Sequence, residues 1–243
     1  MKKILVAEDE QNIREFVVIN LERAGYRAYE AENGDQALAL YDQEKGAFDI
    51  AVLDIMMPGS HDGLAVCKEL RRRNSSIGII MLSAKTQEMD KVSGLMMGAD
   101  DYVTKPFSPS ELVARVDAVY RRVALAAENK EGALRDELRS GEFSLNLRNR
   151  SFMKGGAPIE LTQVEFQIME YFFSNPGTAL ARGDILRHVW GPSYVGEEKI
   201  VDVNIRRLRM KVEDEPSNPK HIVTVWGLGY RWDASVTNVT ADP

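Results

Sequence analysis

Some residues and patterns are scarce in this 243-residue chain, and each scarcity excludes a class of protein. The single cysteine, Cys67, rules out an internal disulfide, and three scattered histidines, His61, His188 and His221, lack the spacing of a zinc site. No apolar run reaches the roughly 18 residues of a membrane span, and acidic residues interrupt the N-terminal apolar run too early for a secretion signal. We therefore expect a globular, cytoplasmic protein that does not enter a membrane.

An excess of positive charge is also lacking. The chain carries 31 Lys and Arg against 37 Asp and Glu, and its net charge is −6. Both halves of the chain are net negative, so any binding of nucleic acid must depend on a local cationic patch. The length fits two domains, each large enough to bury its own core.

Short β-branched runs alternate with amphipathic helical patterns in the first half. This alternation predicts a doubly wound, five-stranded parallel sheet of the flavodoxin-like α/β class, with helices on both faces. The domain should cover residues 1–122. The runs predicted as strands are 4–7, 26–31, 50–53, 77–82 and 102–104, and the clearest helical stretches are 13–24, 64–72 and 112–123.

A different organisation is predicted for the second half. Residues 123–138 are rich in Ala, Glu, Lys, Asp and Arg with little apolar content, which indicates a linker. Residues 139–235 contain small strands around Gly155 and Gly156, helical patterns at 163–173, 182–189 and 199–212, and a terminal hairpin at 221–232. We expect an α+β domain there, followed by a disordered tail at 236–243.

Polar side chains follow four of the predicted strands: Glu8 and Asp9, Asp54, Ser83, and Lys105. Each one alone would be interpreted as a solvated loop residue or a helix cap. Together they should converge, because ligands of doubly wound sheets bind beyond the carboxyl ends of the strands. Clustered carboxylates need a cation, and Mg²⁺ or Mn²⁺ suits oxygen ligands. With Lys and Ser beside it, Asp54 is the candidate nucleophile for phosphoryl transfer.

The motifs ILVAEDE, LDIMMPG, MLSAK and DDYVTKPF resemble, in order and spacing, the receiver domain of bacterial response regulators over residues 1–122. The resemblance implies that a sensor histidine kinase phosphorylates Asp54, and that the Lys105–Pro106 peptide is cis. The roles it implies for other residues are Mg²⁺ ligation by Glu8, Asp9, Asp54 and the Met56 carbonyl, phosphoryl binding by Lys105, and switching by the Ser83 hydroxyl and the Tyr102 ring.

One loop departs from the family pattern. The segment from Pro58 to Gly63 has one residue more than the usual spacing between that proline and the second glycine. The departure puts the shape of the loop in question rather than the chemistry at Asp54. His61 in this loop is interpreted as an exposed residue, since receivers of the family need no second acid–base group.

The segment from Lys91 to Arg122 is a candidate dimer face. In relatives with the same output domain, the matching positions form salt bridges across a symmetric homodimer, which implies a dimer here on phosphorylation. The alternative is ordinary surface charge of little energetic weight. Glu111 also has a competing local role in a capping box with Ser108. The implied pairs are Lys91–Glu111, Asp101–Arg115 and Asp100–Arg122.

The predicted helix at 199–212 has one apolar stripe, and Asn204 and Arg207 lie on a second stripe beside it. Asn and Arg there suit base edges in a major groove, whereas an isolated run of this kind is more often a solvated charged face. The motifs LTQVEFQIMEYF, LARGDILRHVWG, KIVDVNIRRLRMKVED and IVTVWGLGYRW resemble the winged-helix output domain of the OmpR/PhoB class. The resemblance implies two partners, which are double-stranded promoter DNA with direct-repeat sites and RNA polymerase. The implied contacts are Val203, Asn204 and Arg207 to bases, and Arg206, Arg209, Lys211, Thr224 and Tyr230 to phosphates or near the wing.

The wing departs from the commonest pattern, because Trp226 stands where many relatives have Arg. We expect this ring to pack on the hairpin rather than to lie against sugars of the DNA. Two other functions share part of this pattern. A haloacid-dehalogenase-type phosphatase needs an acid two residues after the nucleophile, and that position is Met56. A vestigial receiver that only dimerises would not need the full acidic set with Lys105.

Overall fold

The computed structural model describes residues 2–84, 94–128, 137–192, 194 and 196–235, and it describes the side chains of all these residues except 124–128. The chain divides into two compact units, Met1–Ala124 and Leu125–Pro243.

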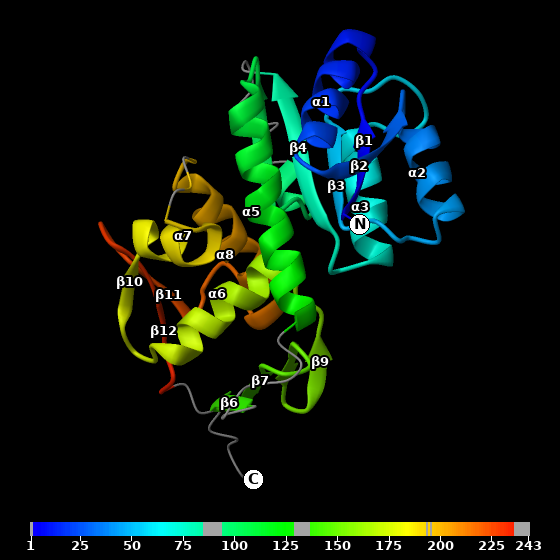
Figure 1. Ribbon diagram of the computed structural model, residues 1–243. Coiled ribbons are helices and arrows are strands. Elements are labelled where there is room, and N and C mark those ends of the chain that lie inside the picture. Colours follow the sequence, from blue (N-terminus) through cyan, green and yellow to red (C-terminus); the bar gives the residue numbers. More distant parts are fainter. Residues whose placement is uncertain (1, 85–93, 129–136, 193, 195, 236–243) are drawn as a thin grey trace. The chain divides into compact units, whose positions relative to one another are not determined.

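The first unit is built on a five-stranded parallel sheet with the strand order β2-β1-β3-β4-β5 (Figure 1). The doubly wound α/β class predicted from the alternation of strands and helices is therefore confirmed. Its strands are β1 (Lys2–Ala7), β2 (Tyr26–Ala31), β3 (Ile50–Asp54), β4 (Gly78–Ala84) and β5 (Asp101–Lys105). Its helices are α1 (Gln11–Arg23), α2 (Gly34–Gln43), α3 (Gly63–Arg73) and α5 (Pro109–Glu128), and residues 94–96 are also helical.

Helices cover the sheet because its central strands are apolar on both faces. All five residues of β3 are buried, as the continuous apolar run predicts for a parallel strand. Val17 and Leu21 of α1 and Val116 of α5 join one core with the sheet, and α2 contacts α3. This sandwich holds the carboxyl ends of the strands at one edge, where the polar residues lie.

The predicted linker, residues 123–138, needs correction at both ends. Helix α5 continues to Glu128, and the first strand of the second unit, β6, begins at Glu137. Alanine and glutamate in this stretch are strong helix formers, so the composition that indicated a linker also supports continuation of the helix. The predicted tail, 236–243, lies outside the described residues.

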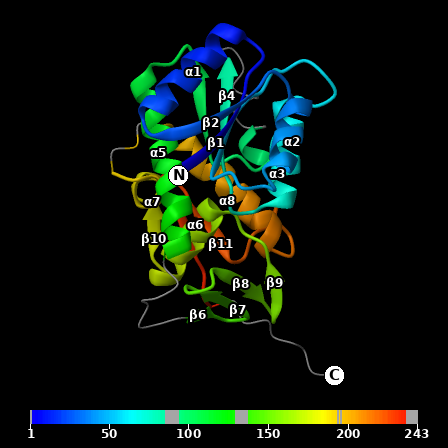
Figure 2. The same cartoon turned by 45° about the vertical axis from the view of Figure 1, so that its right-hand side comes forward.

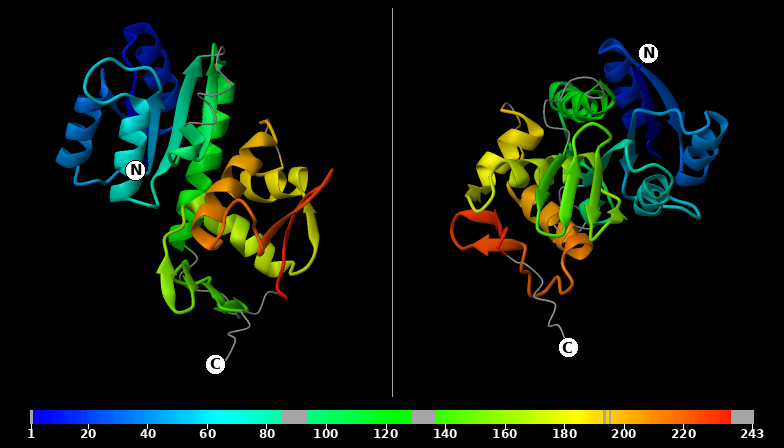
Figure 3. Two further views of the ribbon diagram at one scale, coloured as in Figure 1. Left: turned by 180° about the vertical axis from the view of Figure 1, so that it is seen from behind. Right: turned by 90° about the horizontal axis from the view of Figure 1, so that it is seen from below.

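The second unit contains an antiparallel meander, three helices and a small three-stranded sheet (Figures 2 and 3). The strand order in the smaller sheet is β10-β12-β11, so the terminal hairpin is confirmed, and β10 is a strand that the sequence did not indicate. The meander is β6 (Glu137–Ser140), β7 (Phe143–Asn146), β8 (Ser151–Lys154) and β9 (Ala157–Ile159). The remaining elements are α6 (Gln163–Ser174), β10 (Ala179–Ala181), α7 (Arg182–Trp190), α8 (Lys199–Val212), β11 (Ile222–Val225) and β12 (Gly229–Trp232).

An aromatic cluster joins the parts of this unit. Phe143 of β7 stacks on Phe152 of β8, and its ring edge meets Trp232 of β12 at 5.2 Å between centroids. Phe173 of α6 contacts the same tryptophan. Helix α6 begins with a capping box, in which Thr162 and Glu165 exchange hydrogen bonds. The hairpin, the meander and α6 therefore share one core.

Candidate phosphoacceptor site and nucleic-acid interface

Three carboxylates converge at the carboxyl edge of the parallel sheet. Glu8 and Asp9 follow β1, and Asp54 is the last residue of β3. Each offers an oxygen within 4.8 Å of the other two. Glu8 and Asp54 are buried, and Asp9 is the most exposed of the three. These strand ends therefore lie together, as expected. Their carboxylate oxygens are ligands of the kind that hard divalent cations prefer.

Lys105, the last residue of β5, points into this acidic cluster. Its ammonium donates a hydrogen bond to Oε1 of Glu8 at 2.9 Å and lies 3.1 Å from Oδ2 of Asp54. Burial opposes the charged ammonium, but the hydrogen bond with Glu8 and the charge of Asp54 outweigh it and raise the pKa of Lys105. The cluster therefore holds a permanent cation next to the predicted nucleophile.

Glu8 is the carboxylate whose environment most disfavours ionisation. Burial, with the nearby charge of Asp54, raises the pKa of Glu8 to about 7, although Lys105 opposes the shift. Oε2 of Glu8 lies 2.8 Å from the Lys105 ammonium, yet it accepts no well-formed hydrogen bond and is fully buried. This oxygen has an ionic partner but no hydrogen bond of good geometry, and it belongs to a group of three converging carboxylates, so these residues fit a Mg²⁺ or Mn²⁺ ion.

The remaining predicted residues surround the cluster. Ser83 of β4 is fully buried, and its hydroxyl donates to the carbonyl of Ala84 at 3.2 Å. The ring of Tyr102 is buried on β5, with the guanidinium of Arg115 6.0 Å from its centroid. The side chain of Met56 is exposed just after β3, and the Lys105–Pro106 peptide is cis, as the resemblance implied.

Sequence reasoning missed Arg14. This residue of α1 is buried, and its Nη1 donates to the carbonyl of Glu8 at 2.7 Å and to that of Asp9 at 3.3 Å. The guanidinium thus fixes the backbone of the acidic pair. The signal was available, because Arg14 lies three, four and seven residues before Val17, Val18 and Leu21 and so shares the inward face of the helix.

The loop between β3 and α3 is packed closely against Asp54 at one end. A Cβ atom on Gly63 would lie 1.8 Å from the carbonyl oxygen of Asp54, so only glycine allows this approach. Two residues before Gly63, the loop contacts α2, where Nδ1 of His61 lies 2.5 Å from Oδ1 of Asp35. His61 is thus partly exposed, as predicted, but it is paired rather than free.

The stripe of α8 that was predicted to face DNA, Asn204 and Arg207, is buried instead. Asn204 is 0% exposed, its amide donates to the Ile200 carbonyl, and its oxygen accepts from Arg207 at 3.3 Å. Arg207 is also buried, and its guanidinium lies 2.9 Å from Oε1 of Glu165 on α6. The stripe assigned to bases therefore faces the interior, because the buried carboxylate of Glu165 attracts its cation.

Other residues assigned to DNA have mixed environments. Val203 is buried, whereas Arg206 is exposed. Lys211 is also exposed, although its ammonium pairs with Glu165. Arg209 donates to the Ile222 carbonyl and to the Thr224 hydroxyl, which ties α8 to β11. The Tyr230 hydroxyl donates to Asp202 at 2.7 Å, which ties β12 to the same helix. Asp202 thus has a structural role within the unit.

The expectation for Trp226 is wrong. We expected packing on the hairpin, but the side chain is 91% exposed. The cause is its position in the turn between β11 and β12, where the Leu228 amide donates to the Val225 carbonyl at 3.1 Å and Gly227 has a φ of 75°. A residue at this corner of a tight turn projects away from both strands.

Comparisons with known proteins agree with this geometry. A model of the response regulator receiver domain matches residues 4–117, and a model of the C-terminal domain of transcriptional regulatory proteins matches residues 156–232. The chain is 43% identical over 232 residues to the sensory transduction protein RegX3 of Mycolicibacterium smegmatis, with 95% of this chain and 99% of the relative covered. It is 42% identical over 231 residues to RegX3 of Mycobacterium tuberculosis H37Rv, with the same coverage.

The chain belongs to the two-component response regulators of the OmpR/PhoB class. Two mutants of RitR are similar as solved structures, at 25% identity and TM-scores of 0.73 and 0.75, and each comparison covers 96% of this chain and 99% of the other. This response regulator accordingly has a receiver domain and an OmpR-type DNA-binding domain. Among the residues that the structure describes, no helix is long and apolar enough to cross a membrane.

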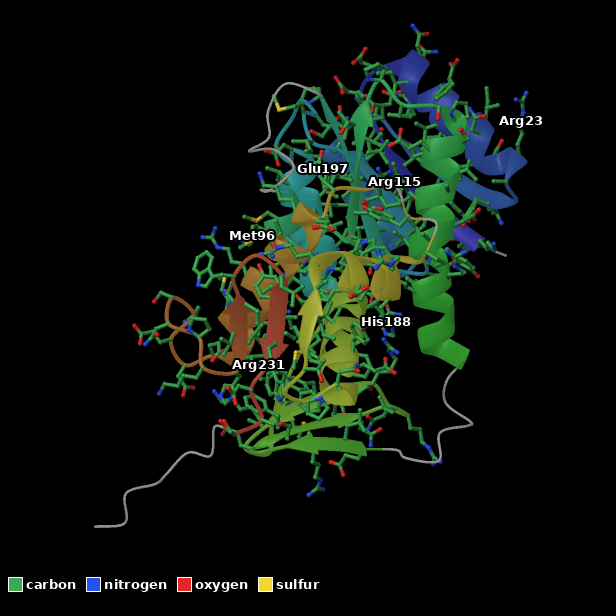
Figure 4. All side chains as sticks on the ribbon, turned by 90° about the vertical axis from the view of Figure 1, so that its left-hand side faces the viewer. Arg23, Met96, Arg115, His188, Glu197 and Arg231 are labelled. Atoms are coloured by element: carbon green, nitrogen blue, oxygen red, sulfur yellow. The ribbon has the colours of Figure 1, made fainter. Side chains whose placement is uncertain are left out.

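The predicted dimer face of this response regulator is engaged within the chain. Arg115, labelled on α5 in Figure 4, lies 3.2 Å from Oδ1 of Asp101 and 3.1 Å from Oε1 of Glu111. Asp100 accepts from Arg71 at 2.8 Å. Arg122 is buried, and Lys91 lies outside the described residues. The Ser108 hydroxyl accepts from the Glu111 amide, so Glu111 takes part in the start of α5 while its carboxylate binds Arg115.

Proposed function

We propose that Asp54 accepts a phosphoryl group from a sensor histidine kinase in a reaction that depends on Mg²⁺ or Mn²⁺. The observation that carries this proposal is the convergence of Glu8, Asp9 and Asp54 within 4.8 Å, with the Lys105 ammonium 3.1 Å from Asp54. A loose phosphoryl-transfer transition state needs an aligned nucleophile and compensation of charge more than it needs proton chemistry. The receiver supplies both at one edge of the sheet.

The chemistry is a displacement at phosphorus. A carboxylate oxygen of Asp54 forms the new P–O bond, the P–N bond of the kinase phosphohistidine breaks, and its electron pair stays on the imidazole nitrogen. A cation held by Glu8, Asp9, Asp54 and the Met56 carbonyl would compensate the charge of the phosphoryl oxygens when bound. The Lys105 ammonium, which already lies beside Asp54, would bind one of these oxygens in the product.

Ser83 and Tyr102 are proposed to couple this reaction to the surface of the receiver. Among the described residues, the buried Ser83 hydroxyl donates to the neighbouring Ala84 carbonyl, a local bond that it can exchange for a bond to a phosphoryl oxygen. Tyr102 lies on the next strand beside Arg115, whose ion pairs with Asp101 and Glu111 form the start of the candidate dimer face. Movement of the serine and the ring would therefore alter these pairs.

Phosphorylation is proposed to promote a homodimer through the face that extends from Lys91 to Arg122. Asp101 and Arg115 already form a pair within one chain, and an exchange of such pairs between two chains would compensate the same charges before and after. Because the Asp101 side chain is fully buried, this pair has to open before it can be exchanged. Asp100 has a further constraint, since its bond to the partly buried Arg71 would have to be shared or broken for a pair with Arg122.

The output domain is proposed to bind double-stranded promoter DNA as direct repeats and to regulate transcription in contact with RNA polymerase. Arg206 on the exposed side of α8 and Trp226 at the tip of the wing support this placement, because both project from the unit rather than into its core. Arg209, Thr224 and Tyr230 then act mainly by fixing the wing to α8. Val203, Asn204, Arg207 and Lys211 would reach DNA only if their present contacts opened.

Mass spectrometry after incubation with acetyl phosphate and Mg²⁺ tests the phosphoacceptor. The wild-type chain should gain the mass of one phosphoryl group, and Asp54→Ala should gain none, because the proposal assigns the attacking carboxylate to Asp54 and Ala has no oxygen to replace it. Omission of the metal should slow the labelling. Labelling of Asp54→Ala at the wild-type rate would refute the assignment.

A further inference from the structure

The loop of residues 55–62 between β3 and α3 has an anchor that the phosphorylation proposal does not use. Both carboxylate oxygens of Asp35, in the first turn of α2, contact this loop. Oδ1 lies 2.5 Å from Nδ1 of His61, and Oδ2 accepts the Ser60 amide at 3.2 Å. The hydrogen bond from His61 is the chief reason that the pKa of Asp35 is below its ordinary value. The loop therefore ends on an ionised carboxylate of a neighbouring helix.

Backbone packing reinforces this anchor. A Cβ atom on Gly34 would lie 2.1 Å from the carbonyl oxygen of His61, so the loop backbone rests directly on the first residue of α2. Asn33 caps that helix by accepting the Gln36 amide, which fixes the position of its first turn. The side chain of His61 thus binds Asp35, and its carbonyl packs against Gly34 in the capped first turn of α2.

The two ends of the loop are joined beside the phosphoacceptor strand. The amide of Gly63, which follows the loop, donates to the carbonyl of Ile55, its first residue, at 3.1 Å, and Gly63 makes the close approach to the Asp54 carbonyl described above. Met56, whose carbonyl is proposed to bind the cation, lies between Ile55 and the residues bound to Asp35. Both of those residues, Ser60 and His61, belong to the segment that is one residue longer than the family spacing.

We propose that His61 and Asp35 form a latch that positions the 55–62 loop for cation binding beside Asp54. They are positioning residues, since neither touches the cation or the reacting atoms. The inference rests on the proposed function in one respect, because it assumes that the cation binds at the acidic cluster. Loss of the latch leaves the carboxylates of Glu8, Asp9 and Asp54 in place but releases the loop that carries Met56.

The effect should be modest. The side chains of His61 and Asp35 are 44% and 49% exposed, so the pair has the strength of a partly solvated interaction. Such pairs contribute little, and we expect loss of the latch to weaken cation binding by about 2- to 5-fold. Higher concentrations of metal should then restore the phosphorylation rate.

The experiment is a titration of the full-length chain with Mn²⁺, followed by electron paramagnetic resonance, in wild type, Asp35→Ala, His61→Ala and the double variant. Asp42→Ala is the matched control, since it removes the same charge from α2 at its far end, where Asp42 pairs with Arg73. Both single variants should raise the Kd for Mn²⁺ by about 2- to 5-fold. The double variant should resemble each single one, because one interaction is lost in all three. The control should match wild type.

His61→Ala separates positioning from simple charge. If the two residues acted only through their charges, removal of an imidazole would leave Mn²⁺ binding unchanged or tighten it, whereas loss of the latch weakens it. Gly34→Ala, which displaces the loop backbone without any change of charge, should weaken binding as well. Equal Kd values for His61→Ala and wild type would overturn the latch.

The outcomes distinguish this inference from the proposed function. If the wild type binds Mn²⁺ but acetyl phosphate does not label Asp54, the proposed function fails while the latch is judged on Kd alone. If Asp54 is labelled and the variants keep the wild-type Kd, the latch fails and the proposed function stands. Wild-type protein that binds no Mn²⁺ at this cluster would contradict both.

Discussion

Replacement of the buried carboxylate of Glu165 should destabilise the output domain strongly. Glu165 is fully buried, lies 2.9 Å from Nη2 of Arg207 and 2.6 Å from the Lys211 ammonium, and caps α6 through the Thr162 amide. Glu165→Gln keeps the volume and an acceptor for the cap but leaves the buried Arg207 facing a neutral amide. Breaking one partner of a buried ion pair costs about 3–5 kcal/mol. Because Lys211 is a third exposed and can turn to water, we expect a loss near 3 kcal/mol.

Urea unfolding followed by tryptophan fluorescence measures this loss in the intended domain. The chain has three tryptophans, Trp190, Trp226 and Trp232, all within the second unit, and the first and last are buried. For a slope of about 2 kcal/mol per molar, a loss of about 3 kcal/mol moves the midpoint down by about 1.5 M urea. Arg207→Met should lower the free energy of unfolding in wild type, and this loss should be smaller by about 1–3 kcal/mol in the Glu165→Gln background. A midpoint within experimental error of wild type would refute the reasoning.

The same pair makes a prediction about pH. Burial alone would raise the pKa of Glu165, but the charges of Arg207 and Lys211 outweigh it and hold the pKa below its ordinary value. A carboxyl whose pKa is lowered by folding adds stability above its unfolded pKa of about 4.3, and this stability is lost as pH falls through the folded pKa. The difference in unfolding free energy between wild type and Glu165→Gln should therefore be full at pH 7 and shrink in acid.

Two further predictions concern the proposed DNA and dimer surfaces. Because Trp226 is the exposed tryptophan and the other two are buried, specific DNA, obtained by selection from random fragments as direct repeats, should protect the fluorescence from acrylamide quenching. Trp226→Arg should raise the affinity for DNA and steepen the salt dependence of DNA binding by roughly one released counterion. If neither the affinity nor the salt dependence changes, the wing does not contact DNA. Beryllofluoride with Mg²⁺ should shift the wild-type chain toward a dimer in sedimentation, and Arg115→Ala should weaken that shift. An unchanged sedimentation coefficient at micromolar concentrations would contradict the dimer.

The receiver site could be predicted from sequence because its geometry follows from topology. In a parallel sheet, the residue after each strand lies at the same edge whatever the loops do, so Glu8, Asp54 and Lys105 had to meet once the strands were recognised. Arg14 was missed for a different reason. The helical pattern places Arg14 on the apolar face, but a cation there is normally a mismatch, and the pattern does not show its partners, which are the carbonyls of Glu8 and Asp9 and the carboxylates of Glu30 and Glu32.

The 55–62 loop illustrates what spacing alone can indicate. Counting residues revealed the additional one, but its consequence depends on α2, which begins about 20 residues before β3 ends. The sequence assigned no role to Asp35, which lies in the first turn of α2, where an acid ordinarily stabilises the helix dipole. Its pairing with His61 required the spatial approach of Gly34 to the loop backbone, and no periodicity reports such an approach.

The two errors in the output domain have one physical origin, which is that partners distant in sequence decide where a polar or aromatic side chain points. Asn204 and Arg207 were assigned outward because polar residues beside an apolar stripe usually face solvent, yet the buried Glu165 of α6 draws them inward. Trp226 was assigned inward because large apolar side chains usually pack, yet a tight turn projects it into solvent. The surface proposed for DNA then has Arg206 among the exposed cations of α8 and an aromatic ring on the wing. If DNA binds there, an aromatic ring in place of an arginine leaves fewer phosphates neutralised, and we expect the salt dependence of binding to be correspondingly shallow.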